Sequence, residues 1–124
     1  MADLYFTEEH EWLLVDGNSA KIGITAYAAE QLGDIVFVEL PDAGRTVKPQ
    51  DEVAVVESVK TASEILAPVS GEITGNNGAL DDAPETVNDD AMGQGWFFTM
   101  KLSNKDELSA LMDQAAYDAF VKEL

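Results

Sequence analysis

The fold depends most on one segment, which reads VVESVKTASEI from Val55 to Ile65. Apolar and β-branched residues at its two ends favour strands, and the polar centre favours a turn between them. If Val59 and Lys60 are the central residues of a tight turn, Ser58 faces Thr61 and Lys60 projects from the tip of a hairpin. The turn lacks the usual Asn-Gly pair, so its geometry needs another source.

Short strands are also expected on both sides of this hairpin. Each candidate is an apolar or β-branched run near turn-forming residues, and the Asp-Gly-Asn sequence at 16–18 joins two of them into a second hairpin. The runs cover residues 12–15, 20–24, 35–40, 53–56, 65–69, a strand starting at 73, and 96–102. Strands this short, with turns this frequent, predict a mostly β domain, as a small sandwich or a barrel.

Two helical regions complete the secondary structure that the sequence predicts. Residues 26–32 are expected to form a short helix with Thr25 as its N-cap and Gly33 as its end. Near the C-terminus, Ser103 and Asp106 resemble a capping box that opens a helical segment over about residues 104–124. Its apolar positions recur at helical spacing and predict a face packed on the β core: Tyr117, Phe120, Val121 and Leu124.

The composition limits the class of protein. The 124 residues fit one domain, 1–124, and the absence of cysteine excludes disulfides and cysteine-based metal or redox sites. The net charge of −17 repels phosphate backbones and anionic lipid, so nucleic acid and membrane surfaces are poor partners. No apolar run approaches the roughly 20 residues of a membrane span, and no secretory or transit signal is visible. We therefore expect a cytoplasmic protein.

Metal binding is not expected. The polar stretch 76–94 contains several acidic residues and no basic residue, but their spacing does not match a calcium-binding loop. We expect a solvated surface loop there. His10 is the only histidine, and the chain has no cysteine nucleophile. The sequence therefore favours neither a metalloenzyme nor a hydrolase. We expect His10 to have a structural role or to contact a bound group.

Lys60 is the residue that points to chemistry. It is the only basic residue between Lys48 and Lys101, in a stretch that holds ten Asp and Glu residues. An amine at a protruding tip is a flexible handle for a carboxylic cofactor that several enzymes must reach. On the charge pattern alone, however, the favoured interpretation is an ordinary surface lysine that pairs with Glu57 or Glu64.

Seven stretches carry a resemblance to a known family. They are residues 5–12 (YFTEEHEW), 23–25 (GIT), 31–41 (QLGDIVFVELP), 55–60 (VVESVK), 67–72 (APVSGE), 95–96 (GW) and the region 117–120. At these separations they are similar to the H-protein of the glycine cleavage system, a lipoyl carrier. The resemblance implies a lipoyl/biotinyl-domain-like fold, a flattened barrel of two small sheets (a barrel-sandwich hybrid) with peripheral helices and the modified lysine at a hairpin tip.

The resemblance also implies a function as a shuttle and not as an enzyme. Lipoate would be attached to Lys60 by a lipoate-attaching enzyme. The arm would take the aminomethyl group of glycine from a pyridoxal-phosphate glycine decarboxylase to a tetrahydrofolate-dependent aminomethyltransferase. A dihydrolipoyl dehydrogenase would then reoxidise it. Tethering raises the effective concentration of the arm at each active site, and we expect a monomer.

In this family the loaded arm is thought to fold back onto the protein, near the segment that matches His10. The matching positions here are Glu9, Glu11, Thr61 and Glu64. A carboxylate suits the task because it can pair with the protonated amine. Many members have Ser in place of Glu9 and Asp in place of Glu64.

Two other readings stay open on the sequence. The first is a lipoyl or biotinyl carrier domain of another multienzyme complex, although biotinyl domains usually place Met on both sides of the lysine, where this chain has Val59 and Thr61. The second is an unmodified interaction module that docks through its acidic surface. Whether the chain also relays lipoate to other acceptors is not decided by its residues.

Overall fold

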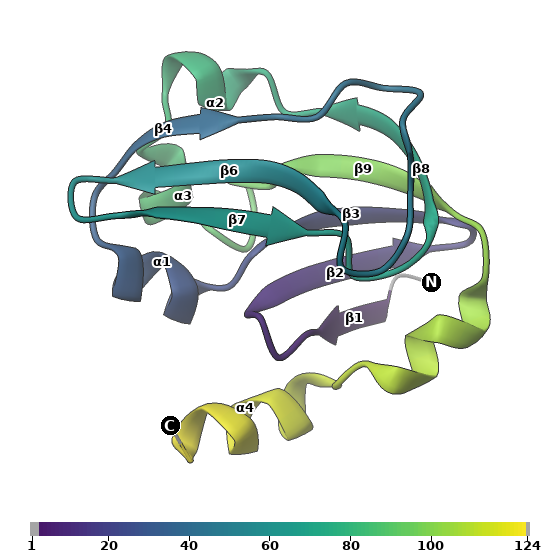
Figure 1. Ribbon diagram of the computed structural model, residues 1–124. Coiled ribbons are helices and arrows are strands. Elements are labelled where there is room, and N and C mark those ends of the chain that lie inside the picture. Colours follow the sequence, from purple (N-terminus) through teal and green to yellow (C-terminus); the bar gives the residue numbers. More distant parts are fainter. Residues whose placement is uncertain (1–2, 124) are drawn as a thin grey trace.

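Two antiparallel sheets face each other in the computed structural model, which describes residues 3–123 (Figure 1). The larger sheet contains, in spatial order, β1 (Asp3–Phe6), β2 (Glu11–Asp16), β3 (Ser19–Ile24), β9 (Phe98–Leu102), β8 (Gly71–Asn76) and β5 (Thr46–Val47). The smaller sheet contains β4 (Ile35–Glu39), β6 (Glu52–Ser58) and β7 (Ala62–Leu66). The predicted mostly β domain is confirmed.

The core lies between the sheets because their strands alternate apolar and polar side chains. In β8, for example, buried Ile73 stands between exposed Glu72 and Thr74. One cluster of buried apolar side chains contains residues of both sheets, and its members Ile73 and Val56 are fully buried. Removing this surface from water is the main favourable term in folding.

The elements that flank the site are those that the sequence predicts. The β2–β3 hairpin turns at Gly17, whose φ is +65°. The helix α1 (Ala26–Leu32) begins at Thr25, whose hydroxyl oxygen accepts a hydrogen bond from the N–H of Ala28 at 3.2 Å. It ends at Gly33, whose N–H donates to the Ala29 carbonyl.

Several strand boundaries differ from the prediction, and β1 and β5 were not predicted. The strand expected over 65–69 is β7, which ends at Leu66, and Pro68 and Val69 are buried outside any strand. Proline has no N–H to donate to a ladder, which agrees with this early end. The last strand, expected from residue 96, begins at Phe98.

The stretch 76–94 is not the solvated loop that its polarity predicts. It contains two short helices, α2 (Ala79–Asp82) and α3 (Thr86–Asp89), and each buries one apolar side chain completely, Leu80 and Val87. A helix of four residues is too short to show a 3.6-residue period, so the pattern does not identify it.

The C-terminal helical segment is divided. A 3₁₀ helix η1 (Lys105–Ala110) is followed by α4 (Gln114–Lys122). The N-cap of η1 is Asn104, whose side chain accepts from the N–H of Asp106 at 3.0 Å, so the predicted cap at Ser103 is wrong. Asparagine caps helices as well as serine does, and it lies one residue closer to the helix.

The helix α4 packs on the first two strands. The ring of Tyr117 stacks on Phe6 with centroids 4.5 Å apart, and both belong with Trp12 to a small cluster of buried side chains. Phe120 and Val121 pack against this cluster, and Leu124 lies outside the described residues. None of the helices formed within residues 3–123 has the length and apolarity needed for a membrane crossing.

Candidate functional site

The turn that carries Lys60 is held by the side chain of Ser58. Its hydroxyl oxygen accepts hydrogen bonds from the N–H groups of Lys60 (3.1 Å) and Thr61 (3.2 Å), and the hydroxyl donates to the Thr61 carbonyl (3.2 Å). The Ser58 N–H donates to the same carbonyl at 2.8 Å. The hydrogen bonds of this serine thus stabilise a turn that lacks the Asn-Gly pair usual in tight hairpins. The predicted hairpin with Val59 and Lys60 at its tip is confirmed.

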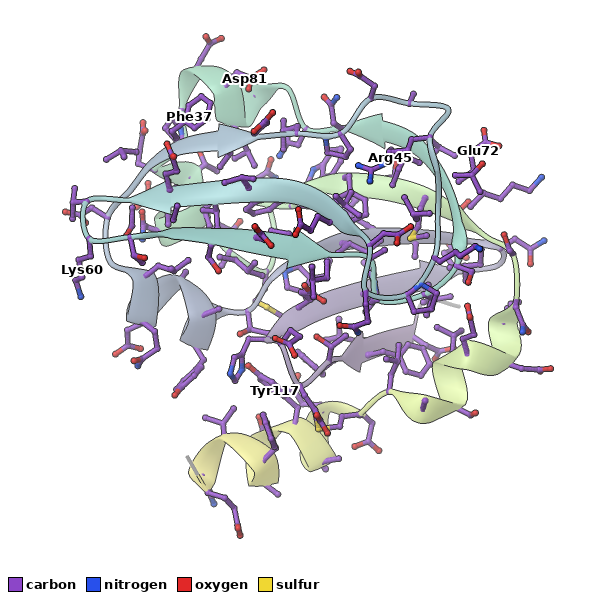
Figure 2. All side chains as sticks on the ribbon, viewed as in Figure 1. Phe37, Arg45, Lys60, Glu72, Asp81 and Tyr117 are labelled. Carbon is purple, nitrogen blue, oxygen red and sulfur yellow. The ribbon has the colours of Figure 1, made fainter. Side chains whose placement is uncertain are left out.

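Lys60 is exposed at this tip and extends toward the side on which α1 lies (Figure 2). The N–H of Val59 donates to the carbonyl of Asp34 at 3.0 Å, which ties the tip to the segment that follows α1. A Cβ atom on Gly33 would lie 3.1 Å from the Cε of Lys60. The lysine side chain therefore passes closely over the end of α1, and glycine leaves the room for it.

A groove of about 290 Å³ lies between α1 and the lysine hairpin. Its lining comes from α1 (Tyr27, Ala28, Gln31, Leu32), from the hairpin strands (Val56, Ser63, Glu64, Ile65) and from the N-terminal third of the chain (Glu9, His10, Ile24). Leu32 directly precedes Gly33, so Lys60 lies at one end of the groove. The rings of His10 and Tyr27 have centroids 4.8 Å apart, and they mark the other end, at the first turn of α1.

The groove combines apolar side chains with neutral polar groups and two carboxylates. Glu9 and Glu64 are its carboxylates, and no lysine or arginine is among the lining residues. The carboxyl group of Glu52 raises the pKa of Glu64, through a shared hydrogen bond and through charge repulsion. An apolar chain with a cationic end fits such a groove, because the cation would relieve this repulsion.

Glu11 lies beneath the surface of the protein and does not line the groove. It is 2% exposed, and its two carboxylate oxygens accept hydrogen bonds from the Leu66 N–H (2.9 Å) and the Thr7 hydroxyl (3.2 Å). Burial raises the pKa of Glu11 to about 7, although these two hydrogen bonds oppose the shift. A buried carboxylate on β2 with a partner on β7 is well placed to fix the sheets to each other.

The structure therefore separates the predicted site residues into three places. Glu9 and Glu64 share the groove, and Lys60 lies at its end. Thr61 is exposed in the turn, and Glu11 is buried. The predicted contacts of all four residues with a bound arm stay predictions.

Sequence reasoning missed three residues that shape this site. A serine before a turn is a known signal of side-chain bonding to the backbone, so the role of Ser58 was visible in principle. Gly33 was expected only as the end of a helix. Tyr117, whose hydroxyl bonds to the groove residue His10, gives no local signal of that contact because its partners are distant in the sequence.

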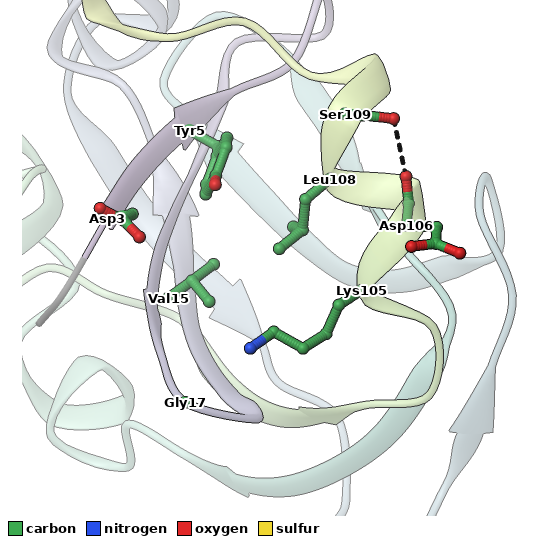
Figure 3. Close-up of a pocket in the computed structure, with 8 residues that line it drawn as sticks. All are labelled: Asp3, Tyr5, Val15, Gly17, Lys105, Asp106, Leu108 and Ser109. Atoms are coloured by element: carbon green, nitrogen blue, oxygen red, sulfur yellow. Dashed lines mark hydrogen bonds between the residues drawn. The ribbon is translucent and has the colours of Figure 1, made fainter.

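A larger cavity, of about 560 Å³, lies between β1 and η1 (Figure 3). Lys105 extends from η1 toward the side where Val15 and Gly17 lie, and the Ser109 hydroxyl donates to the Asp106 carbonyl. None of the predicted site residues lines it. Within the described chain, no group of three or more His, Asp or Glu side chains is arranged to hold a metal ion.

Known proteins match this chain over nearly its whole length. Residues 4–124 match the family model described as Glycine cleavage H-protein. The chain is 58% identical over 125 residues to the glycine cleavage system H protein of Rhodospirillum rubrum, and 55% identical over 124 residues to that of Parvibaculum lavamentivorans. Each match covers 100% of this chain and 99% of the relative.

The fold has a solved counterpart as well. A crystal structure of a glycine cleavage system H protein from Mycobacterium marinum superposes with a TM-score of 0.88 at 35% sequence identity, and the match covers 97% of both chains. The lipoyl-domain-like fold predicted from the sequence is thereby confirmed.

Proposed function

Because the chain belongs to the glycine cleavage H-protein family, we propose that it is a lipoyl carrier with lipoate attached to Lys60 through an amide bond. One observation carries the proposal. The amine of Lys60 stands on a turn fixed by four hydrogen bonds of Ser58, at the end of a groove that can receive the attached group.

The residues around Lys60 suit a lipoyl group. Leu32, Ala28 and Ile65 offer apolar contacts to an alkyl chain that starts at the lysine. The group would supply the disulfide and dithiol chemistry when it is bound, while the protein supplies position and shelter. Because the turn is held in place and the lysine side chain is flexible, the base of the arm stays fixed while the amine at its end is free to swing.

The proposed task is the relay of the glycine cleavage system. The carrier takes the aminomethyl group of glycine from the pyridoxal-phosphate glycine decarboxylase to the tetrahydrofolate-dependent aminomethyltransferase, and dihydrolipoyl dehydrogenase restores the disulfide. An exposed tip serves this sequence because the attaching enzyme and three later partners must all reach the same group. A tethered group also has a high effective concentration at each partner's active site.

The groove is proposed as the resting place of the loaded arm. Glu9 and Glu64 would pair with the protonated amine at the groove's polar positions. Thr61 lies at the base of the arm, beside Lys60, and is proposed to contact it there. Glu11 is proposed to act from beneath the groove, since it directly follows His10 and lies two residues after Glu9 in the chain.

Intact-mass measurement tests the attachment. After expression in a host that can lipoylate, the chain should gain the mass of one lipoyl group, and Lys60→Arg should gain none. Lys48→Arg, an exposed lysine elsewhere, is the control and should be modified like the parent. A biotinyl mass would favour a carrier of another complex. An unmodified chain that still supports glycine cleavage would favour an acidic docking module.

A further inference from the structure

A chain of hydrogen bonds connects α4 to the groove. The hydroxyl of Tyr117 lies 2.8 Å from the Nδ1 atom of His10 and 2.8 Å from the hydroxyl of Thr25. His10 lines the groove, and Thr25 is the N-cap of α1, which forms the groove wall. One side chain of the last helix therefore contacts both features at this end of the groove, although it lies 107 residues from His10.

The position of Tyr117 is well determined by packing. Its ring stacks on Phe6 and is 4% exposed. His10 has a φ of +66°, a conformation that residues other than glycine seldom adopt, so its backbone is held in place by its surroundings. The ring of His10 also contacts Phe120, with centroids 5.9 Å apart. Both partners of the hydrogen bond are thus fixed before any ligand is considered.

The positions of the protons in these two hydrogen bonds can be assigned by counting donors and acceptors. Thr25 is buried, and its oxygen already accepts from the Ala28 N–H, so its own hydroxyl proton needs an acceptor. Within residues 3–123 that acceptor is the Tyr117 oxygen. Tyr117 then donates its proton to Nδ1 of His10, which must be unprotonated. The reverse order would leave the Thr25 proton buried without a partner, which costs free energy.

We infer that Tyr117 is a positioning residue of the groove, which fixes His10 as the neutral tautomer with its proton on Nε2. Every buried side-chain nitrogen and oxygen in the described chain has a partner, and no partner of Nε2 is found there, so Nε2 is open to solvent. His10 therefore offers one N–H donor at the groove's end and no positive charge.

The neutral state matters if the arm rests in the groove, so this part of the inference rests on the proposed function. A cationic imidazole would repel the protonated amine that Glu9 and Glu64 are proposed to bind. Burial lowers the pKa of His10, and the Glu9 carboxylate opposes the shift. The other titratable side chains near His10 are Tyr27 on α1, Tyr117 on α4 and Glu64 across the groove, and none of them is cationic.

The tautomer can be read directly by NMR, because His10 is the only histidine. With ¹⁵N-histidine labelling of the unmodified protein near pH 7.5, long-range ¹H–¹⁵N spectra should show an unprotonated Nδ1 and a protonated Nε2. Tyr117→Phe keeps the ring that stacks on Phe6 but removes the hydroxyl, so both signals should move toward an average of the two tautomers. Tyr27→Phe is the matched control: its ring contacts His10, its hydroxyl does not bond to it, and the pattern should stay.

A proton on Nδ1 in the parent protein, or an unchanged pattern in Tyr117→Phe, would overturn the inference. Because lipoate is absent from this experiment, that result is independent of whether the chain is a lipoyl carrier. A well-dispersed amide spectrum of each variant shows that it is folded.

The second readout uses the lipoylated protein loaded with methylamine. Hydrolysis of the adduct should be about two- to tenfold faster in Tyr117→Phe, the range expected for the loss of one hydrogen bond. Tyr5→Phe, which removes a hydroxyl from the other cavity, should hydrolyse at the parent rate. Equal hydrolysis rates in Tyr117→Phe and the parent would show that the tautomer of His10 does not protect the loaded arm, and would reject the inference.

Discussion

The carboxylate of Glu11, on β2, accepts a hydrogen bond of 2.9 Å from the backbone N–H of Leu66, on β7. The two strands belong to different sheets, so this buried side chain connects the layers directly. Its second oxygen is bonded by Thr7. The connection lies below the groove and beside the lysine hairpin, which links the stability of the fold to the place where the arm is proposed to rest.

Replacement of Glu11 by Gln should change how stability depends on pH. The pKa of Glu11 is about 7 in the folded protein and 4.5 without the fold's influence, so the folded state keeps a proton that the unfolded chain releases in this window. The contribution of Glu11 to the unfolding free energy therefore falls by about 3 kcal/mol as pH rises from 4.5 to 8, and it changes little above that. Glu11→Gln does not titrate, and its amide oxygen can accept from the Leu66 N–H while its NH2 group donates to the Thr7 hydroxyl oxygen.

Urea denaturation at a series of pH values tests this prediction. Relative to the parent, Glu11→Gln should become more stable by about 3 kcal/mol between pH 4.5 and pH 8. Other carboxyl groups titrate in both proteins and cancel in the difference. Parallel pH profiles for the two proteins would show that Glu11 titrates normally.

Replacement of Glu52 by Gln should lower the pKa of Glu64. The Glu52 carboxyl group raises that pKa, so without its charge the Glu64 carboxyl should titrate closer to an ordinary glutamate. NMR titration of the side-chain carboxyl carbon measures the change. Glu57→Gln, an exposed position on the same strand as Glu52, is the control. If both variants leave the Glu64 titration where it is, the coupling between Glu52 and Glu64 is absent.

The loaded arm should be less protected in Glu64→Gln. If this carboxylate pairs with the amine, its loss should speed hydrolysis of the methylamine adduct about threefold or more, as expected for one charge-assisted contact at a partly exposed site. Glu57→Gln keeps the groove intact and should behave like the parent. A Glu64→Gln adduct as long-lived as that of the parent would remove Glu64 from the proposed binding residues.

Ser58→Ala should loosen the lysine turn. The change removes the three hydrogen bonds of the side chain, and we expect a loss of about 1–2 kcal/mol in unfolding free energy together with slower lipoyl attachment. Thr has a hydroxyl at the same place, so Ser58→Thr should recover much of both losses. Denaturation and time-resolved mass spectrometry give the two measurements. Equal attachment rates in Ser58→Ala and the parent would mean that the attaching enzyme does not need a preformed turn.

Gly33→Ala should cost about 1–3 kcal/mol of stability. The φ of +86° and ψ of −155° at Gly33 lie in a region that only glycine occupies readily, and the added Cβ would press on Lys60. Gly78→Ala is the matched control, since Gly78 has a φ of −58° and no atom closer than 3.9 Å to a new Cβ. The control should stay within about 0.5 kcal/mol of the parent in thermal or urea unfolding. If Gly33→Ala and Gly78→Ala lost the same unfolding free energy, the backbone conformation of Gly33 would not be the cause of the loss.

The sequence predicts the hairpins and the helix α1 because their causes are local. A turn sequence such as Asp-Gly-Asn and a cap such as Thr25 act within a few residues of where they stand. The position of Lys60 at a tip follows in the same way. Its cofactor does not: charge pattern alone favours an ordinary lysine, and only the long resemblance to a family points to lipoate.

Other features could not be predicted because their causes are distant. Leu80 and Val87 look like single apolar residues in a polar stretch, and they are buried only because the stretch folds back over β4 and α1. The groove is assembled from three separate parts of the chain. Glu11 illustrates the limit most clearly, since the family resemblance marks it as a candidate for a functional contact, while the fold gives it two structural partners.

The bond between Tyr117 and His10 also has a consequence for the order in which the protein matures during synthesis. The lysine hairpin depends on contacts only a few residues apart, which form quickly and need little of the chain. The His10 end of the groove needs Tyr117 of α4, which is synthesised well after the hairpin. A product that ends before α4 would therefore hold Lys60 on its turn while His10 lacks its partner. Under the proposed function, lipoate attachment would then not need α4, whereas shelter of the arm would.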